Sequence, residues 1–170
     1  MFINSGNYSE YLLLIYFNER TISMEIERKF LINTLPDLDK YNFHIIEQAY
    51  LCTEPVVRIR KEDTNYYMTY KSKGFLKREE YNLPLTPNSY NHLLEKADGN
   101  IITKKRYLIP YLNHTIELDV FEGVFDGTVL AEVEFDSTDE ADNVIPPDWF
   151  GEDVTYSKEY HNSYMSSIKL

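Results

Sequence analysis

The stretch Met24-Glu-Ile-Glu-Arg-Lys-Phe-Leu31 alternates charged and apolar side chains. Because successive side chains of a β-strand point to opposite faces, Glu25, Glu27 and Lys29 share one face and Ile26 lies on the other. The stretch therefore predicts a strand with one charged face.

The same arrangement recurs along the chain. It is found at Arg58-Ile59-Arg60, Lys71-Ser72-Lys73, Arg78-Glu79-Glu80, Lys104-Lys105-Arg106, Glu117-Leu118-Asp119 and Glu132-Val133-Glu134. Several of these motifs are flanked by aromatic and β-branched residues, which favours a sheet with one charged face. An open sheet would turn that face to water and a closed barrel would gather it into a lumen. The pattern alone does not distinguish the two.

Seven further stretches predict strands, for eight in total. They span residues 43–53, 56–61, 66–73, 77–85, 101–109, 115–121 and 128–135. The hairpin-length connections favour antiparallel pairing. Helical spacing or composition predicts helices over residues 89–97, 137–143 and 158–168, with a packed turn over residues 146–151. The predicted class is therefore α+β, mainly β.

Composition limits the possible partners. A chain of 170 residues suits one domain. A net charge of −11 argues against nucleic-acid or membrane partners, which are themselves polyanionic. The basic residues are concentrated in the strand motifs, as expected of an enzyme for a small polyanion. Cys52 is the only cysteine, so no intrachain disulfide can form and we expect a cytoplasmic protein. The expected oligomeric state is monomer or homodimer.

Residues 1–23 precede the predicted domain, which spans residues 24–170. Their apolar run, Tyr11 to Phe17, is much shorter than the roughly 20 residues that a membrane-spanning helix needs. We expect residues 1–23 to be an N-terminal extension, with Met24 as an alternative start of translation.

The motifs together resemble one known family. The opening Glu25-x-Glu27-x-Lys29 is similar to the signature of the CYTH superfamily, the triphosphate tunnel metalloenzymes. The similarity continues in family order through Arg58-x-Arg60, Thr69-Tyr70-Lys71, Arg78-x-Glu80, Lys104-x-Arg106, residues 118–123, residues 131–135, Val154-Thr155 and Tyr160-x-Asn162. The chain most resembles the short bacterial, tripolyphosphatase-like members. One departure is Asn82, which stands where many relatives carry a second glutamate.

The resemblance implies a fold and a set of roles. The fold is an eight-stranded antiparallel β-barrel, or tunnel, with outer helices and a C-terminal helix. The implied ligands of Mg²⁺ or Mn²⁺ are Glu25, Glu27, Glu134, Glu80, Asp119 and Glu132. The implied phosphate-binding residues are Lys29, Arg58, Arg60, Lys71, Arg78, Lys104 and Arg106. Lys29, Glu27 and Lys158 are the implied catalytic residues. We expect Lys158 and Tyr160 to close the tunnel and contact the substrate.

The charges themselves support a highly charged ligand. So many acids and bases cannot be buried unpaired, because each would cost several kcal/mol. Carboxylates suit Mg²⁺ or Mn²⁺, and arginine and lysine suit phosphate oxygens. Without the resemblance, exposed ion pairs across strands would explain the same pattern.

The expected function is metal-dependent hydrolysis of inorganic tripolyphosphate to pyrophosphate and phosphate. The alternatives are a thiamine or nucleoside triphosphatase, a class IV adenylyl cyclase, and a non-catalytic module that binds polyphosphate or nucleotide.

Overall fold

The structure is a computed structural model that describes residues 22–169. The expected N-terminal extension therefore lies outside the described residues up to residue 21. The strands are β1 (Ile22–Ile32), β2 (Phe43–Thr53), β3 (Val56–Glu62), β4 (Asn65–Lys71), β5 (Lys77–Pro84), β6 (Asp98–Tyr111), β7 (His114–Glu122), β8 (Val129–Glu134) and β9 (Phe150–Asp153).

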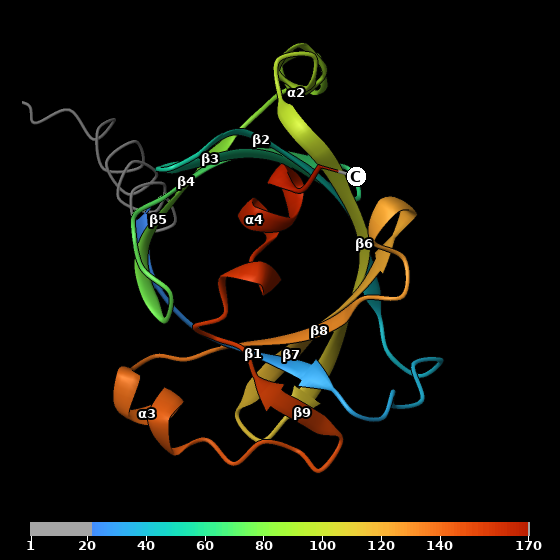
Figure 1. Ribbon diagram of the computed structural model, residues 1–170, viewed down its shortest axis with the longest axis vertical. Helices are drawn as coiled ribbons and strands as arrows, with labels where there is room; N and C mark the ends of the chain where they lie inside the picture. Colours follow the sequence, from blue (N-terminus) through green and yellow to red (C-terminus); the bar gives the residue numbers. More distant parts are fainter. Residues whose placement is uncertain (1–21, 170) are drawn as a thin grey trace, which may run out of the picture.

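The first eight strands form a closed antiparallel barrel. Their order is β5-β4-β3-β2-β6-β7-β8-β1, and a further pairing between β1 and β5 closes the ring. Figure 1 shows this ring end-on, viewed along the barrel axis. Closure pairs every barrel strand on both sides, so the barrel leaves few exposed sheet edges. The eight-stranded barrel expected from the resemblance is confirmed.

Strand β9 was not predicted, because residues 146–151 were interpreted as a turn. It pairs with the second half of β1, where Phe30 faces Asp153 and Ile32 faces Phe150. Strand β5 pairs only with the first half of β1, as far as Ile26, so the second half has a free edge for β9. The rings of Phe30 and Phe150 lie 4.7 Å apart and hold β9 in place.

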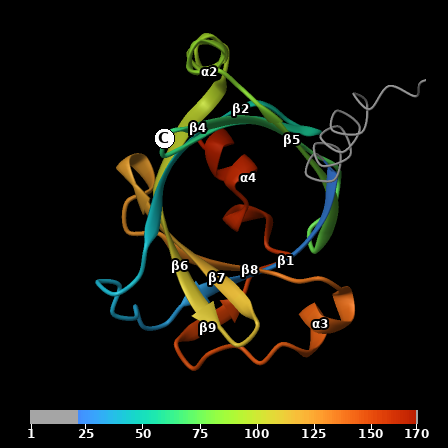
Figure 2. The same cartoon turned by 180° about the vertical axis from the view of Figure 1, so that it is seen from behind.

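Two short helices cover the outside of the barrel (Figure 2). Helix α2 (Pro87–Leu94) begins earlier than predicted because Thr86 caps it, its Oγ1 accepting a hydrogen bond from the Ser89 backbone N–H. Helix α3 (Thr138–Asn143) is capped in the same way by Ser137, which accepts from the Glu140 N–H.

The predicted C-terminal helix over residues 158–168 is interrupted. A 3₁₀ turn, η2 (Lys158–Tyr160), is followed by His161 in an extended conformation and then by α4 (Asn162–Ser167). Helix α4 packs against β6 and β2 and lies within the outline of the ring in both views (Figures 1 and 2). The C-terminal helix is therefore part of the barrel interior.

The barrel has a charged inner face and an apolar outer face over much of its wall. Ile26, Phe30, Leu118 and Val133 pack outward into one apolar cluster with the β9 residue Phe150. A second cluster, which includes Tyr90, lies beneath α2. A third, which includes Phe121, Phe125 of the 3₁₀ turn η1 (Gly123–Phe125) and Met165 of α4, fills one end of the barrel. The apolar core thus lies largely outside the barrel.

Two further observations bear on the setting. Cys52 lies in an apolar, strand-like stretch that predicts a buried thiol, but the thiol is exposed near the end of β2. Among the described residues no helix has the length and apolar character needed to cross a membrane.

Candidate active site

A cavity of about 110 Å³ runs inside the barrel. Most of its wall consists of charged side chains from seven strands, all of the barrel strands except β2. The lining residues are Glu25, Glu27, Lys29, Tyr50, Val56, Arg58, Arg60, Lys71, Arg78, Glu80, Arg106, Glu117, Glu132, Glu134, His161, Asn162 and Ser163. We call this cavity the tunnel.

The tunnel wall has balanced formal charge, because six of its residues are carboxylates and six are lysines or arginines. Most of these groups form ion pairs across the lumen. Lys29 contacts Glu132 at 2.6 Å and Arg78 contacts Glu25 at 2.7 Å. Lys71 bridges Glu25 and Glu80, and Arg106 bridges Glu117 and Glu132. The interior is therefore a connected network of opposite charges, not a set of exposed ladders.

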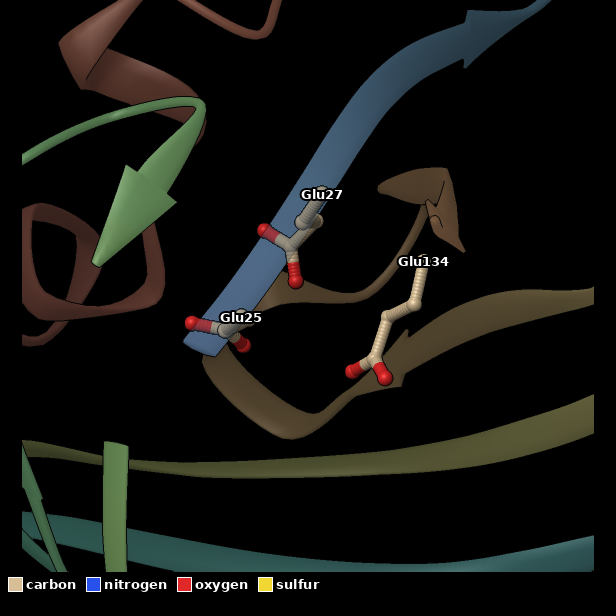
Figure 3. Close-up of side chains that lie close together, drawn as sticks. All are labelled: Glu25, Glu27 and Glu134. Carbon is tan, nitrogen blue, oxygen red and sulfur yellow. The ribbon is translucent and has the colours of Figure 1, made fainter. Parts of the chain in front are cut away.

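Three carboxylates gather at one place on the wall. Glu25, Glu27 and Glu134 each offer an oxygen, and these oxygens all lie within 4.8 Å of one another. Two come from β1 and the third from β8, where Glu134 is the direct cross-strand partner of Glu27. Figure 3 shows the three side chains projecting into one space. Convergent hard oxygen atoms at this spacing suit a divalent cation such as Mg²⁺ or Mn²⁺. We call this set the carboxylate trio.

Two of the buried carboxylates are held ionised by bases. Burial alone would raise the pKa of Glu25, but Lys71 and Arg78 outweigh it and lower the pKa. Burial likewise opposes ionisation of Glu132, and Lys29 and Arg106 hold its pKa well below the usual value. These carboxylates are already neutralised by the protein.

At the other two members of the trio, nearby bases do not outweigh burial and like charges. Burial, followed by the charge of Glu132, raises the pKa of Glu27. Desolvation, followed by the charges of Glu117, Glu25 and Glu27, raises the pKa of Glu134 to about 7. Two adjacent carboxylates with raised pKa values mark excess negative potential, which a bound cation would relieve.

Two residues expected at the site lie away from it. Lys104 and Asp119 are fully buried and pair with each other, and Arg106 contacts the same aspartate at 2.7 Å. Neither residue lines the tunnel. Asp119 shares Arg106 with Glu117, as its inward placement by alternation along β7 predicts, but its carboxylate is occupied by Lys104 and Arg106.

Lys158 is also separate from the tunnel. Its side chain is exposed on η2, where Nζ lies 5.6 Å from the ring centroid of Tyr164. The remaining expected residues line the tunnel together.

Sequence reasoning missed several groups at the site. Tyr50, His161, Asn162 and Ser163 line the tunnel without having been assigned a role, and Glu117, which alternation places on the charged face, lines it as well. Gln48 accepts hydrogen bonds from Arg60 at 3.1 and 3.3 Å and so orients that guanidinium. Of these residues, His161, Asn162 and Ser163 come from the C-terminal segment, and the Tyr160-x-Asn162 motif in the sequence pointed to that segment.

Asn82 is part of a hydrogen-bonded chain between β4 and β5. Thr69 Oγ1 donates to Asn82 Oδ1 at 2.6 Å, and Asn82 Nδ2 donates to Glu80. Glu80 in turn holds Lys71 at 2.6 Å. The amide therefore orients a tunnel carboxylate that a second glutamate would repel.

Comparisons with known proteins agree with this geometry. The sequence pattern of the CYTH domain family matches residues 23–166. An inorganic triphosphatase of Nitrosomonas europaea is 40% identical over 147 residues, which cover 84% of this chain and 96% of the relative. An inorganic triphosphatase of Acetivibrio thermocellus is 31% identical over 143 residues, or 82% of this chain and 90% of the relative. The crystal structure of an inorganic triphosphatase superposes with a TM-score of 0.63 at 38% identity, over 84% of this chain and 93% of that one.

Fold and site together define a closed antiparallel barrel that surrounds a charged tunnel. The chain belongs to the CYTH domain family.

Proposed function

We propose that this protein is a metal-dependent inorganic triphosphatase, which hydrolyses tripolyphosphate to pyrophosphate and phosphate. The observation that carries the proposal is the tunnel wall, in which six carboxylates and six basic residues face one cavity. The names of the two curated relatives support the same activity.

The charge balance explains why a metal should be required. A triphosphate carries several negative charges, and four of the bases that would hold it, Lys29, Lys71, Arg78 and Arg106, are already paired with carboxylates. If the anion takes those bases, the carboxylates lose their partners. A divalent cation at the trio restores neutrality, so anion and cation are expected to bind together.

We assign the roles as follows. Glu25, Glu27 and Glu134 would hold Mg²⁺ or Mn²⁺, with Glu80 and Glu132 supporting them. Lys29, Arg58, Arg60, Lys71, Arg78 and Arg106 would bind the phosphates. Because Lys104 and Asp119 lie outside the lining, we propose that they support the wall. Lys158 stays a prediction as a closing residue.

The chemistry needs in-line positioning and charge neutralisation more than a covalent nucleophile. The cation would polarise phosphoryl oxygens and lower the pKa of a bound water. The arginines and lysines would fix the chain of phosphates by several contacts and stabilise the charge on the leaving diphosphate. The burial of Lys29 and its distances of 3.7 Å to Glu27 and 2.6 Å to Glu132 support this role for it.

An inorganic substrate fits the wall better than a nucleotide. Seventeen described residues line the tunnel, and of these only Tyr50, Val56 and His161 are apolar or aromatic. Sites for organic ligands are usually lined mainly by apolar and aromatic groups. A base or thiamine ring would find little such surface here.

The test is phosphate and pyrophosphate release from tripolyphosphate, thiamine triphosphate, ATP and GTP with Mg²⁺ or Mn²⁺. We expect tripolyphosphate to have the highest kcat/KM. A higher kcat/KM for thiamine triphosphate or a nucleotide would identify that compound as the substrate in place of tripolyphosphate. Formation of cyclic AMP from ATP would indicate a cyclase. Saturable tripolyphosphate binding without phosphate release would indicate a non-catalytic module. We further propose a cytoplasmic protein, monomer or homodimer.

A further inference from the structure

The two ends of the tunnel differ. At the start of β6, α4 lies so close that a Cβ on Gly99 would meet the Ser166 carbonyl oxygen at 2.2 Å. Asn100 Nδ2 there donates to the Ile168 carbonyl at 2.7 Å. At the other end of β6, residues 113–115 border a second hollow that also contacts Glu25, Glu80 and Glu134. The C-terminal segment therefore closes the end away from this acidic opening.

Asn162, the first residue of α4, lines the tunnel at the closed end. Asn162 is only 8% exposed, and its Oδ1 has no hydrogen-bond partner within the described part of the chain. Buried amide groups are normally hydrogen-bonded, because leaving one unsatisfied destabilises the fold. An unsatisfied amide facing a cavity therefore points to a ligand.

Arg58 gives a second, independent sign. It lines the same tunnel, is 6% exposed, and its Nε also has no hydrogen-bond partner in residues 22–169. The neighbouring bases differ, since Lys29, Lys71, Arg78 and Arg106 all contact carboxylates. A buried guanidinium without such a partner is suited to an anion. Two residues that each carry an unsatisfied buried group thus line the same tunnel.

We propose that Asn162 is a substrate-binding residue, which donates from Nδ2 to an oxygen of the phosphoryl group nearest α4, in the same subsite as Arg58. A half-turn about the last side-chain bond exchanges Oδ1 and Nδ2, so this position can present a donor to an anion. The inference rests on the proposed function and adds to it a ligand from the C-terminal segment. That segment then both closes the tunnel and recognises the substrate.

The test compares Asn162→Leu, Asn162→Asp and the control Ser167→Ala, which is exposed on the same helix. Three quantities are measured: KM and kcat for tripolyphosphate with Mg²⁺, the melting temperature of the free protein, and the rise in melting temperature on adding tripolyphosphate with Ca²⁺. For Asn162→Leu we expect KM to rise about tenfold, as for the loss of one hydrogen bond, with kcat nearly unchanged. The free protein should melt no lower than wild type, because an unsatisfied polar group has been removed.

Asn162→Asp is nearly isosteric, so it tests the site if the leucine variant fails to fold. Its negative charge should raise KM more than leucine does and reduce the ligand-induced shift, while Ser167→Ala should match wild type. A lower melting temperature with wild-type KM would make Asn162 purely structural and overturn the inference. The inference would also be overturned if Asn162→Leu and Asn162→Asp both kept the wild-type KM and the wild-type rise in melting temperature on adding tripolyphosphate with Ca²⁺. If wild type neither binds nor hydrolyses tripolyphosphate, the proposed function fails, and this inference with it.

Discussion

Glu27 on β1 and Glu134 on β8 are direct cross-strand partners, so two carboxylates face each other inside the barrel. Like charges in this position destabilise a sheet. The pKa values of both groups are raised, as expected when neither has enough positive charge nearby. A site that costs stability without its ligand is typical of function, and metal should relieve the repulsion.

Glu134→Gln should raise the melting temperature of the metal-free protein, and the gain should depend on pH. The pKa of Glu134 is about 7 in the folded protein against 4.5 in the reference state. The folded state therefore binds this proton more tightly, and the resulting stabilisation is lost as pH rises from about 4.5 through about 7. Melting curves at pH 5 and pH 8 should show little difference between variant and wild type at pH 5 and a clear one at pH 8.

The matched control is Glu79→Gln on β5, since Glu79 is exposed and lies outside the tunnel lining. It should leave the pH dependence unchanged. Equal melting temperatures for Glu134→Gln and wild type at pH 8 would argue against a repulsive trio.

Metal affinity should increase with pH around neutrality. A carboxylate must lose its proton to bind a cation, and the pKa of Glu134 is raised to about 7 by desolvation and by neighbouring glutamates. Titration with Mn²⁺, followed by electron paramagnetic resonance, should give tighter binding at pH 8 than at pH 6. The dependence should weaken in Glu134→Gln. An affinity that is constant over this range would place the metal elsewhere.

The two kinds of charge should separate in steady-state kinetics. Glu134→Gln should mainly lower kcat by weakening the metal, whereas Arg60→Ala should mainly raise KM, provided that Arg60 contacts the ground and transition states equally. Initial rates over a range of tripolyphosphate concentrations measure both. If kcat falls and KM rises to the same extent in both variants, the division into metal-binding and phosphate-binding residues is wrong.

Asp119→Asn should affect stability more than metal binding. Asp119 is completely buried between Lys104 and Arg106, and removing one partner of a buried ion pair typically costs about 3–5 kcal/mol. Urea unfolding should detect this loss, and the exposed Asp126→Asn should show none. Wild-type stability combined with loss of Mn²⁺ binding would instead return Asp119 to the set of metal ligands.

The sequence was sufficient to predict most of the barrel. Alternation within β1 and β8 identified which side chains share a face, and the predicted bounds of β2, residues 43–53, match the structure. Alternation does not reveal how strands lie around a ring, so it could not show that Asp119 is enclosed by two bases while Glu134 remains available. Those differences depend on side chains from other strands.

The C-terminal segment was harder to predict for a different reason. The interruption at His161 and the position of α4 depend on contacts with β6, and Gly99 allows that close approach. The position of Gly99 just after the helix predicted over residues 89–97 indicates a helix end, whereas Gly99 belongs to β6. A local pattern could not show that this glycine faces residues more than sixty positions away.

The most direct test of the account is ³¹P nuclear magnetic resonance of tripolyphosphate incubated with the purified protein and Mg²⁺ or Mn²⁺. We predict that the tripolyphosphate signals are replaced by equal amounts of pyrophosphate and phosphate, that pyrophosphate then accumulates, and that chelation of the metal stops the reaction. Tripolyphosphate that stays intact with either metal and folded protein, or that is hydrolysed equally well after chelation, would contradict the account.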